Sequence, residues 1–512
     1  MRHPRALLTL ALLVAGLLAP ATAGAAAKAT HIVQLRPGHT LAQGQAAVSA
    51  AGGTVTGRLP LIRGLAVDLP PAARARLARD PSVAAIDVNA TTRSTGKAPP
   101  TTATLLSDRG YAQLAASYPR SVFAPQTWLS ATGAGVGVAV IDTGIDGTLP
   151  DFNDGSDESR IVASVVTNPD AQTAQDTYGH GTHVAGIVAG DGRRRSYEDP
   201  GVARYVGIAP DANLIAIKAS DDEGGGTILD VIYGLQFAVD HKADYNIRVV
   251  NLSLASTIAT SYRTDPLDAA VEAAHFHGIL VVAAAGNRGT DADATHYSPG
   301  NDPYALTVGA VDDQGTTDRT DDVVADWSST GQTQDGIAKP EITAPGAHIV
   351  STLAGGSAFA ELCPTCVVDG TYIRLGGTSM AAPVVAGAAA LVFEQHPDWT
   401  PDEVKATLTE TARDVESGPA EVDVYAATTT ENPIGSANQG LVPNDLIDTA
   451  TGDIDETRSS WGRSSWGNAP ESLVAGWARS SWGCVCGAPS DGTVESTRSS
   501  WGAATWLVRW DD

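Results

Sequence analysis

Short apolar runs rich in β-branched residues alternate with alanine-rich helical patterns through the middle of the chain. The apolar runs lie at 137–141, 214–218, 249–254 and 280–284, and helical patterns cover 228–240 and 265–278. Thr400 and Glu403 form a capping box, with Pro401 in the first helical position, that predicts a helix over 401–413. Apolar strands interleaved with helices are typical of a parallel sheet covered on both faces. We therefore predict an α/β domain over 125–430, with a central, mostly parallel sheet.

A shorter pattern precedes this domain. It predicts strands at 31–35, 54–59, 64–69 and 83–88, with helices at 46–51 and 71–79. Together they predict a small α+β domain over 27–92, of roughly 60 structured residues, near the lower size for independent folding. The polar stretch 93–124, interrupted by Pro99 and Pro100, has one weak helical pattern near 110–116 and predicts a linker open to cleavage.

The last part of the chain, 431–512, has a different composition. Arg-Ser-Ser-Trp-Gly occurs four times, starting at Arg458, Arg463, Arg479 and Arg498, but the irregular spacing does not support a solenoid. Three roles stay open for this Trp-rich tail: stacking on cell-wall or other polysaccharide, docking as strands on the rest of the chain, or a flexible tail removed on maturation.

The first residues have the three parts of a secretory signal. Arg2 and Arg5 precede the apolar run 6–18, and small residues follow at 21–25, so we assign 1–26 as a signal peptide. The run is shorter than the roughly 20 apolar residues of a spanning helix. We expect a secreted, extracellular protein with no stable membrane insertion.

The net charge of -25 is unevenly distributed. Eleven Lys and Arg against three Asp give the first hundred residues +8, which leaves -33 for the rest. Nucleic acid is therefore not an expected partner, because phosphate binding needs clustered basic residues. Surplus carboxylates in secreted proteins are often used for Ca²⁺, and the acidic loop 151–158 makes structural calcium a candidate, although no metal ligands are identified.

The four cysteines form two close pairs. For an exported chain we favour a disulfide between Cys363 and Cys366 that closes a small loop, and the state of Cys484 and Cys486 stays open. The spacing is a weak zinc signal.

Ser379 lies near the start of a long run of small and apolar residues that extends from Gly376 to Phe393. Pro383 is tolerated only near a helix start, which predicts Ser379 at or beside the N-terminal end of a buried helix. The unpaired N–H groups there stabilise developing negative charge. A serine in this place is either a helix cap or a nucleophile, and its partners decide between the two.

Candidate partners follow the ends of other elements. Asp142 ends the strand 137–141, where sites form in open α/β sheets, and His180 opens a second buried helical pattern. Asn287 follows the strand 279–285, either in a turn or as a hydrogen-bond donor. His180 and His183 could also bind metal as an i, i+3 pair, but no zinc-protease motif accompanies them.

Together these stretches resemble the subtilisin-like serine proteases, the subtilases (peptidase family S8). The resemblance covers about 124–427 and lies in Val-Ile-Asp-Thr-Gly-Ile-Asp at 140–146, His-Gly-Thr-His-Val-Ala-Gly at 180–186, Ala-Gly-Asn at 285–287, Lys-Pro-Glu-Ile-Thr-Ala-Pro-Gly at 339–346 and Gly-Thr-Ser-Met-Ala-Ala-Pro at 377–383. It implies an Asp142, His180 and Ser379 triad that works through an acyl-enzyme. It also implies Asn287 and the Ser379 N–H as the oxyanion hole, with no cofactor required for catalysis.

The resemblance also implies how peptide substrates bind. Two stretches would clamp an extended substrate as edge strands, and residues beside Asn287 would line the pocket before the cut: Ser253, Leu254, Ala255, Gly224, Gly225, Gly226, Ala285 and Gly286. Ala255 replaces the family's usual glycine, and Tyr297 stands where a smaller residue is common, so pocket size and substrate preference stay open.

The front domain resembles the inhibitor-type propeptide of subtilases, best over 32–38. It implies a basic propeptide that docks in cis on the acidic catalytic domain and is removed by self-cleavage between about 90 and 124. We therefore predict a secreted serine endopeptidase made as an autoprocessed zymogen. The alternative is a catalytically idle surface-binding protein that uses its Trp-rich tail on a subtilase scaffold.

Overall fold

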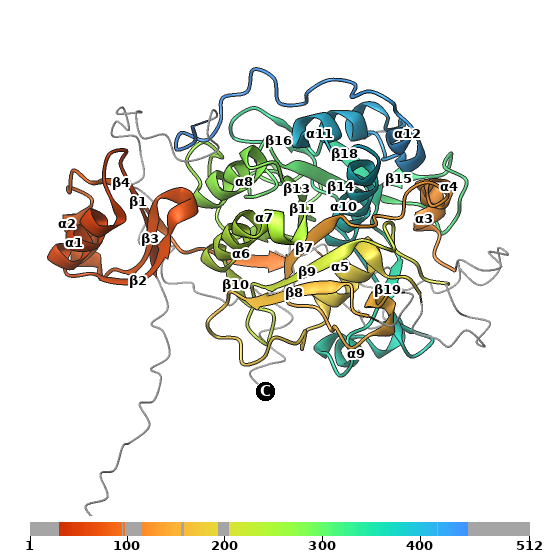
Figure 1. Ribbon diagram of the computed structural model, residues 1–512, viewed down its shortest axis with the longest axis horizontal. Coiled ribbons are helices and arrows are strands. Elements are labelled where there is room, and N and C mark those ends of the chain that lie inside the picture. Colours follow the sequence, from red (N-terminus) through yellow and green to blue (C-terminus); the bar gives the residue numbers. More distant parts are fainter. Residues whose placement is uncertain are drawn as a thin grey trace, which may run out of the picture.

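The computed structural model describes residues 30–94, 96–97, 115–154, 158–192, 204–416 and 418–448. A small α+β unit lies at one end, in red, against a larger α/β body (Figure 1). Outside the described residues lie the predicted signal peptide, residues 449–512 of the Trp-rich tail, which include Cys484 and Cys486, and most of the weak helical pattern near 110–116.

The small unit is an antiparallel sheet with two helices on one face. Its sheet has the order β2-β3-β1-β4, and its elements are β1 His31–Leu35, α1 Leu41–Ala51, β2 Thr54–Leu59, η1 Pro60–Ile62, β3 Gly64–Asp68, α2 Pro71–Leu77 and β4 Val83–Val88. Helix α1 begins five residues earlier than predicted, because Thr40 and Gln43 form a capping box. Gly44 within α1 allows close packing, since a Cβ there would lie 2.5 Å from Leu35 Cδ1.

The other face of the small unit packs on the body. Ile32, Leu59, Ile62 and Ala66 belong to the same buried apolar cluster as the core of the body. Across the boundary, the Leu61 N–H donates to Gln236 Oε1 at 2.6 Å. The small unit is therefore docked through a continuous core as well as tethered by the chain.

The body is built on an eight-stranded sheet in the order β15-β14-β13-β11-β7-β9-β8, with β18 also on β14. All the pairings are parallel except that of β15 with β14. The strands are β7 Gly137–Asp142, β8 Ile161–Val166, β9 Asn213–Lys218, β11 Ile247–Leu252, β13 Leu280–Ala284, β14 Leu306–Asp312, β15 Val323–Val324 and β18 Ile342–Pro345. This confirms the predicted α/β class.

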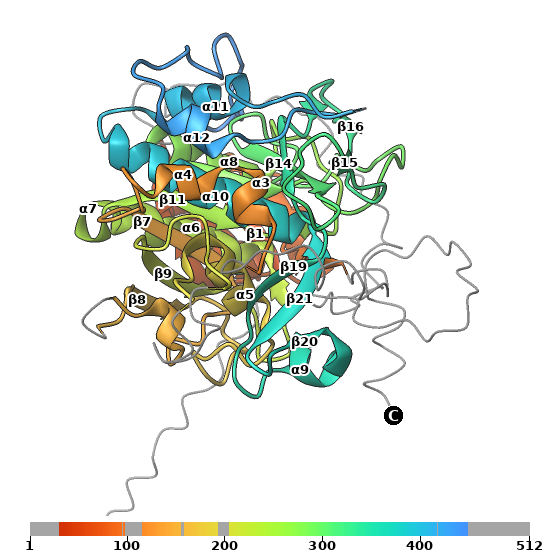
Figure 2. The same cartoon turned by 90° about the vertical axis from the view of Figure 1, so that its right-hand side faces the viewer.

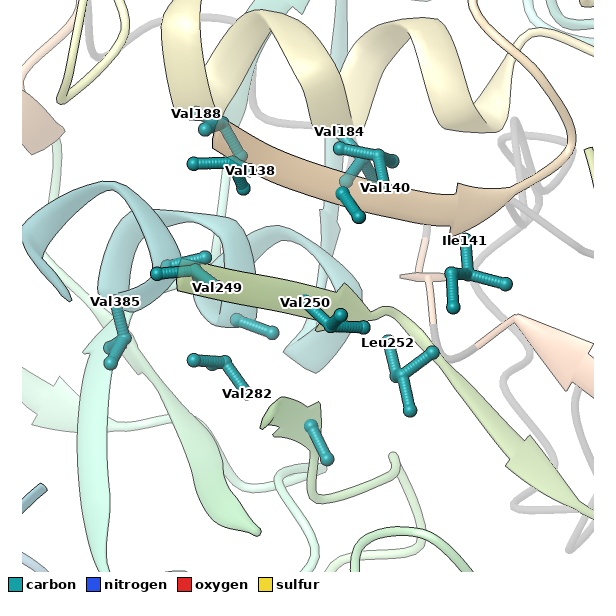
Figure 3. Packing of buried hydrophobic residues seen from close by; sticks show 14 of the residues in the cluster. Val138, Val140, Ile141, Val184, Val188, Val249, Val250, Leu252, Val282 and Val385 are labelled. Carbon is teal, nitrogen blue, oxygen red and sulfur yellow. The ribbon is translucent and has the colours of Figure 1, made fainter. Parts of the chain in front are cut away.

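Helices cover both faces of this sheet. Alternate residues of a strand point to opposite faces. Val138 and Val140 lie beside Val184 and Val188 of α5 (Figure 3), whereas a Cβ on Gly234 of α6 would lie 3.0 Å from Ile141. The main helices are α5 His180–Ala189, α6 Ile228–Asp240, α8 Pro266–Phe276, α10 Thr378–Gln395 and α11 Pro401–Glu410.

Shorter elements connect these layers and surround the strand ends. They are α3 Tyr118–Ser121, α4 Ala124–Thr127, η2 Pro150–Phe152, α7 Lys242–Tyr245, β16 Gly331–Gln332, β17 Ala338–Lys339, β19 Ile349–Thr352, α9 Ala358–Leu362, η3 Pro364–Cys366, β20 Val367–Val368, β21 Tyr372–Gly377 and α12 Val424–Thr428. In Figure 2, α9 and β20 lie together at the lower edge of the body. No helix in the described part of the chain is long and apolar enough to span a membrane.

One predicted strand was wrong. The apolar run 249–254 divides at Ser253, so that β11 ends at Leu252 and a separate strand, β12 Leu254–Ser256, leaves the main sheet. Ser253 Oγ accepts a hydrogen bond from Asn251 Nδ2 at 2.9 Å and donates to the Ser379 carbonyl oxygen at 2.8 Å. The hydrogen bond to α10 overrides the local strand pattern.

Candidate active site

Asp142 and His180 meet where a strand and a helix end. Asp142 is the last residue of β7 and His180 is the first of α5. His180 Nδ1 lies 2.8 Å from Asp142 Oδ1, and neither side chain is exposed to solvent. The carboxylate therefore sets the orientation of the imidazole and makes Nδ1 the nitrogen that carries hydrogen toward it.

The turn before α5 is fixed by a buried carboxylate. Asp176 accepts hydrogen bonds from the N–H groups of Gly179 and Thr182 and from the hydroxyls of Thr143 and Thr182. Burial raises the pKa of Asp176, and these donors oppose that rise. Gly181 is needed next to the pair, because a Cβ there would lie 2.2 Å from the Gly144 carbonyl oxygen. The His-Gly-Thr-His motif is thus shaped by the approach of α5 to β7.

Ser379 is the second residue of α10, which places it at the helix start as predicted. Proline has no N–H, so Pro383 leaves the Ser379 carbonyl without its usual helical donor. Ser253 Oγ supplies that hydrogen bond at 2.8 Å, and Ser379 Oγ donates to the Ser253 carbonyl oxygen at 2.9 Å. This reciprocal pair fixes the start of α10 against the end of β11.

Asn287 lies beside the same helix start. Its Oδ1 accepts from the Thr378 N–H at 3.0 Å, and the Gly286 N–H donates to Thr378 Oγ1 at 3.0 Å. Because Asn287 Oδ1 accepts from Thr378, Nδ2 is the end of the side chain that can donate to another group. The structure therefore brings Asp142, His180, Ser379 and Asn287 to one edge of the sheet, the edge at which the parallel strands end.

A segment of the chain itself lies between the two predicted edge strands. β5 Thr91–Ser94 pairs antiparallel with β10 Gly226–Thr227 on one side and with β12 on the other. Among the predicted substrate-binding residues, Leu254, Ala255 and Gly226 pair directly with it. Gly224 and Gly225 form the turn before β10, and Gly224 has φ +85°.

Beyond β5 the chain passes the start of α10. β6 Gly96–Lys97 pairs antiparallel with the end of β21, with Gly96 opposite Gly377 and Lys97 opposite Gly376. Part of the expected linker over 93–124 is therefore extended strand. Sequence reasoning missed this segment, although its threonines favour strands.

Two further predicted residues have structural contacts near this edge. The Ala285 N–H donates to the Val308 carbonyl oxygen at 3.0 Å, at the end of β13. Ser253 bonds to Ser379, as described above, and does not belong to either strand that flanks it.

Cys363 and Cys366 form a disulfide.

The described residues show no metal centre. No group of three or more His, Cys, Asp and Glu in the described ranges could hold a metal ion. His183 Nε2 lies 3.1 Å from the Ile373 carbonyl oxygen, and burial lowers the pKa of His183 to about 3. In the acidic loop, Asp151 Oδ1 accepts from Tyr372 Oη at 2.8 Å, and the Asp151 carbonyl accepts from the buried Arg160 guanidinium at 2.7 Å. These contacts hold the described part of the loop within the protein, and structural calcium stays a prediction.

The stretch 339–346 has a structural part. Lys339 Nζ is buried and donates to Glu341 Oε1 at 2.6 Å and to Thr307 Oγ1 at 2.8 Å. Burial lowers the pKa of Lys339 to about 8. The pair joins β17 and β18 to β14, away from the edge that carries Ser379.

Comparison with known proteins identifies the family. The profile of Peptidase_S8, described as the subtilase family, matches residues 133–440. This chain belongs to the subtilase family. The match contains Asp142, His180, Asn287 and Ser379, and it confirms the resemblance drawn from the motifs.

Subtilases from two genera are similar to the chain. The serine protease AprX of Bacillus subtilis is 42% identical over 283 residues, which are 54% of this chain and 61% of AprX. Subtilisin E of the same organism is 33% identical over 366 residues, 71% of this chain and 79% of subtilisin E. Fervidolysin from Fervidobacterium pennivorans, a keratinolytic enzyme related to subtilisin, has a similar structure, with a TM-score of 0.63 and 25% identity over 80% of this chain and 62% of fervidolysin. The chain thus spans less than two thirds of AprX and of fervidolysin.

Proposed function

We propose that this subtilase is a serine endopeptidase made as a zymogen. The observation that carries the proposal is one arrangement: the buried Asp142 and His180 pair, Ser379 at a helix start, Asn287 beside it, and an extended peptide segment held between β10 and β12. A protein that only binds surfaces has no use for this combination.

The residues divide the reaction among them. Ser379 Oγ attacks the carbonyl carbon of the scissile bond while His180 takes the hydroxyl proton, and Asp142 stabilises the imidazolium that forms. Asn287 Nδ2 and the Ser379 N–H donate to the oxyanion of the tetrahedral intermediate. His180 then gives its proton to the leaving amine. A water molecule then attacks the acyl-enzyme in the same way, with His180 again as the base. The product leaves as a carboxylate, and Ser379 regains its hydroxyl.

Backbone pairing defines the substrate class. The Thr91–Ser94 segment completes a three-stranded sheet with β10 and β12. Its hydrogen bonds use backbone groups that every extended peptide offers, so this mode accepts many sequences. The proposed substrates are therefore unfolded stretches of proteins or peptides.

The N-terminal unit is the proposed propeptide. Its chain leaves the docked sheet, crosses between the edge strands and reaches β21 next to Ser379. Besides the apolar contacts, Asn89 Oδ1 accepts from the Leu229 N–H at 3.1 Å, at the start of α6. Such a unit blocks the site until it is cut and released.

The pairings limit the position of the first cut. Ser94 lies opposite Leu254, and Gly96 lies opposite Gly377, two residues before Ser379. The peptide bonds between Ser94 and Gly96 therefore lie between the pairing with β12 and the pairing with β21. We predict that the chain cuts itself there, which narrows the range of 90 to 124 expected from the sequence.

The released N-terminal fragment tests this prediction. Its intact mass should correspond to a C-terminus at Ser94 or residue 95, and a Ser379→Ala chain expressed in a host without other secreted proteases should release no fragment. A fragment that ends beyond Lys97, or one released equally from Ser379→Ala, would contradict self-processing at this position.

A buried carboxyl group of the small unit is influenced by the charge of a buried carboxyl group of the body. Asp87 of β4 is 8% exposed, and Asp265 is the N-cap of α8 in the body. Burial, and then the charge of Asp265, raises the pKa of Asp87 well above its usual value, while Arg74 opposes the rise. The docked unit therefore holds a proton that the free unit releases. Docking is strongest below the ordinary pKa of Asp87 and weakens as pH rises toward the raised value.

Asp87→Asn should remove this part of the pH dependence. We expect the cleaved wild-type unit to dissociate faster at about pH 8 than at about pH 5, because the docked state disfavours the charged Asp87 carboxylate. The Asp87→Asn variant should show a smaller difference between the two rates. Size-exclusion chromatography of the cleaved complex over time measures both rates, with Asp68→Asn as the control. Equal pH dependence in wild type and variant would contradict this account.

The proposal includes secretion, which the signal-like start of the sequence supports. It includes no nucleic-acid partner, because the body is acidic. The idle surface-binding alternative depends on the tryptophans of the tail, which all lie beyond the described residues.

A further inference from the structure

We propose that Phe359 is a positioning residue for His180, and that the segment 357–366, which ends in the Cys363–Cys366 disulfide, holds Phe359 in place. The proposal rests on the proposed function, since it assigns a residue that keeps the catalytic base in working geometry. Phe359 lies in α9, outside the motifs that carry the family resemblance.

The ring of Phe359 packs against Tyr178 and His180, the residues on either side of Gly179. Its ring is completely buried, and its centroid lies 5.0 Å from that of Tyr178 and 6.2 Å from that of His180. The planes of Phe359 and His180 are at 89°, an edge-to-face arrangement that aromatic rings favour. The apolar ring therefore packs against the imidazole, while Asp142 holds Nδ1.

Backbone contacts tie α9 to the same turn. The Ala358 N–H donates to the Thr177 carbonyl oxygen at 2.9 Å, and the Phe359 N–H donates to that of Tyr178 at 3.2 Å. Gly179 has φ +108°, and a Cβ there would lie 2.8 Å from Ser357 Oγ. A shift of the start of α9 would therefore displace the residues that lead into His180.

The disulfide closes the other end of this short helix. The Cys363 N–H donates to the Phe359 carbonyl oxygen at 3.1 Å, and Cys363 is bonded to Cys366. Directly after it, β20 pairs with β21, the strand that runs into the start of α10 and Ser379. One segment, 357–377, thus connects the turn of His180 with the nucleophile helix.

The contact also reaches the peptide-binding edge. Tyr178 lies under Gly224, because a Cβ on Gly224 would be 2.9 Å from Tyr178 Cγ. Phe359 therefore supports the base directly and, through Tyr178, the turn before β10. Loss of the ring should affect the chemical step more than peptide binding, because Phe359 packs directly against His180 and reaches the turn before β10 only through Tyr178.

The test replaces Phe359 by leucine, which keeps an apolar side chain but removes the ring that faces His180. The processed protein from the full chain should lose between about tenfold and a hundredfold in kcat, with KM changed less than about threefold. Phe393→Leu is the matched control: Phe393 is equally buried, near the far end of α10, and its ring lies under Arg248. The control should lower the melting temperature similarly and leave kcat nearly unchanged.

A spectroscopic reading separates positioning from general loosening. The Nδ1 proton between His180 and Asp142 should give a low-field ¹H resonance in wild type and Phe393→Leu, and a broadened, faster-exchanging one in Phe359→Leu. In a Cys363→Ser, Cys366→Ser background, Phe359→Leu should lower kcat by a smaller factor than in the wild-type background, because the disulfide supports His180 through the Phe359 ring.

Three results would overturn the proposal: an unchanged kcat and resonance in Phe359→Leu, equal losses in Phe393→Leu, or strictly additive effects with the cysteine variant. Failure of the proposed function is distinguishable from these, because an inactive wild type would still report the His180 environment through the Nδ1 proton.

Discussion

Ser379→Ala is expected to fold, to remain a full-length chain and to lose essentially all peptidase activity. The loss in kcat should be about a millionfold, a figure that comes from subtilisin itself and is carried over to this relative. Alanine fits the buried site, but it removes the hydroxyl that attacks the scissile carbonyl. The Ser253 hydroxyl can still cap the residue 379 carbonyl, because that hydrogen bond uses the backbone.

The matched control is Ser121→Ala. Ser121 is also completely buried, and its Oγ donates to the Tyr118 carbonyl oxygen at 3.1 Å, far from Ser379 along the chain. Hydrolysis of a chromogenic peptide and gel analysis of the secreted chain measure both variants. A Ser379→Ala protein that still hydrolyses the peptide above background would show that another nucleophile is used.

Asp142→Asn should reduce kcat by about ten-thousandfold while the fold is kept, an effect of the size known from related triads. The 2.8 Å contact between Asp142 Oδ1 and His180 Nδ1 lies in a completely buried place. An amide has no negative charge to stabilise the imidazolium, and its NH₂ group can hold the imidazole in the wrong tautomer. KM should change little, because Asp142 does not lie on either edge strand.

Asp151→Asn is the control for this variant. Asp151 is equally buried, but its carboxylate accepts from Tyr372 Oη and lies outside the His180 pair. We expect its melting temperature to fall and its kcat per folded molecule to stay within a few-fold of wild type. Steady-state kinetics with circular dichroism separate the two effects. Similar kcat losses in both variants would mean that buried charge in general, rather than the Asp142 contact, supports the rate.

The positions of the candidate site residues in the fold could be predicted because each lies where an element begins or ends. Asp142 follows an apolar strand, His180 opens a helix of small residues, and Pro383 requires a helix start close to Ser379. These are local signals, readable within a few residues. The fold class followed from the same alternation of buried strands and helices, which depends on neighbouring residues more than on distant contacts.

What could not be predicted depends on long-range contacts. Strand β5 pairs with residues more than a hundred positions away, and its polar threonines gave no apolar pattern. Ser253 divides a continuous apolar run because of a hydrogen bond to α10. Phe359 belongs to no motif, and only the folded chain brings its ring to His180. The local pattern of apolar and polar residues predicts none of these features.

The central claim is that Ser379 is the nucleophile of a peptidase. The most direct test treats the secreted, processed protein with a fluorophosphonate probe and identifies the modified peptide by mass spectrometry. The account predicts one adduct, on Ser379, that is absent from Ser379→Ala and strongly slowed in Asp142→Asn. An unlabelled processed protein, or an adduct on another residue, would contradict it.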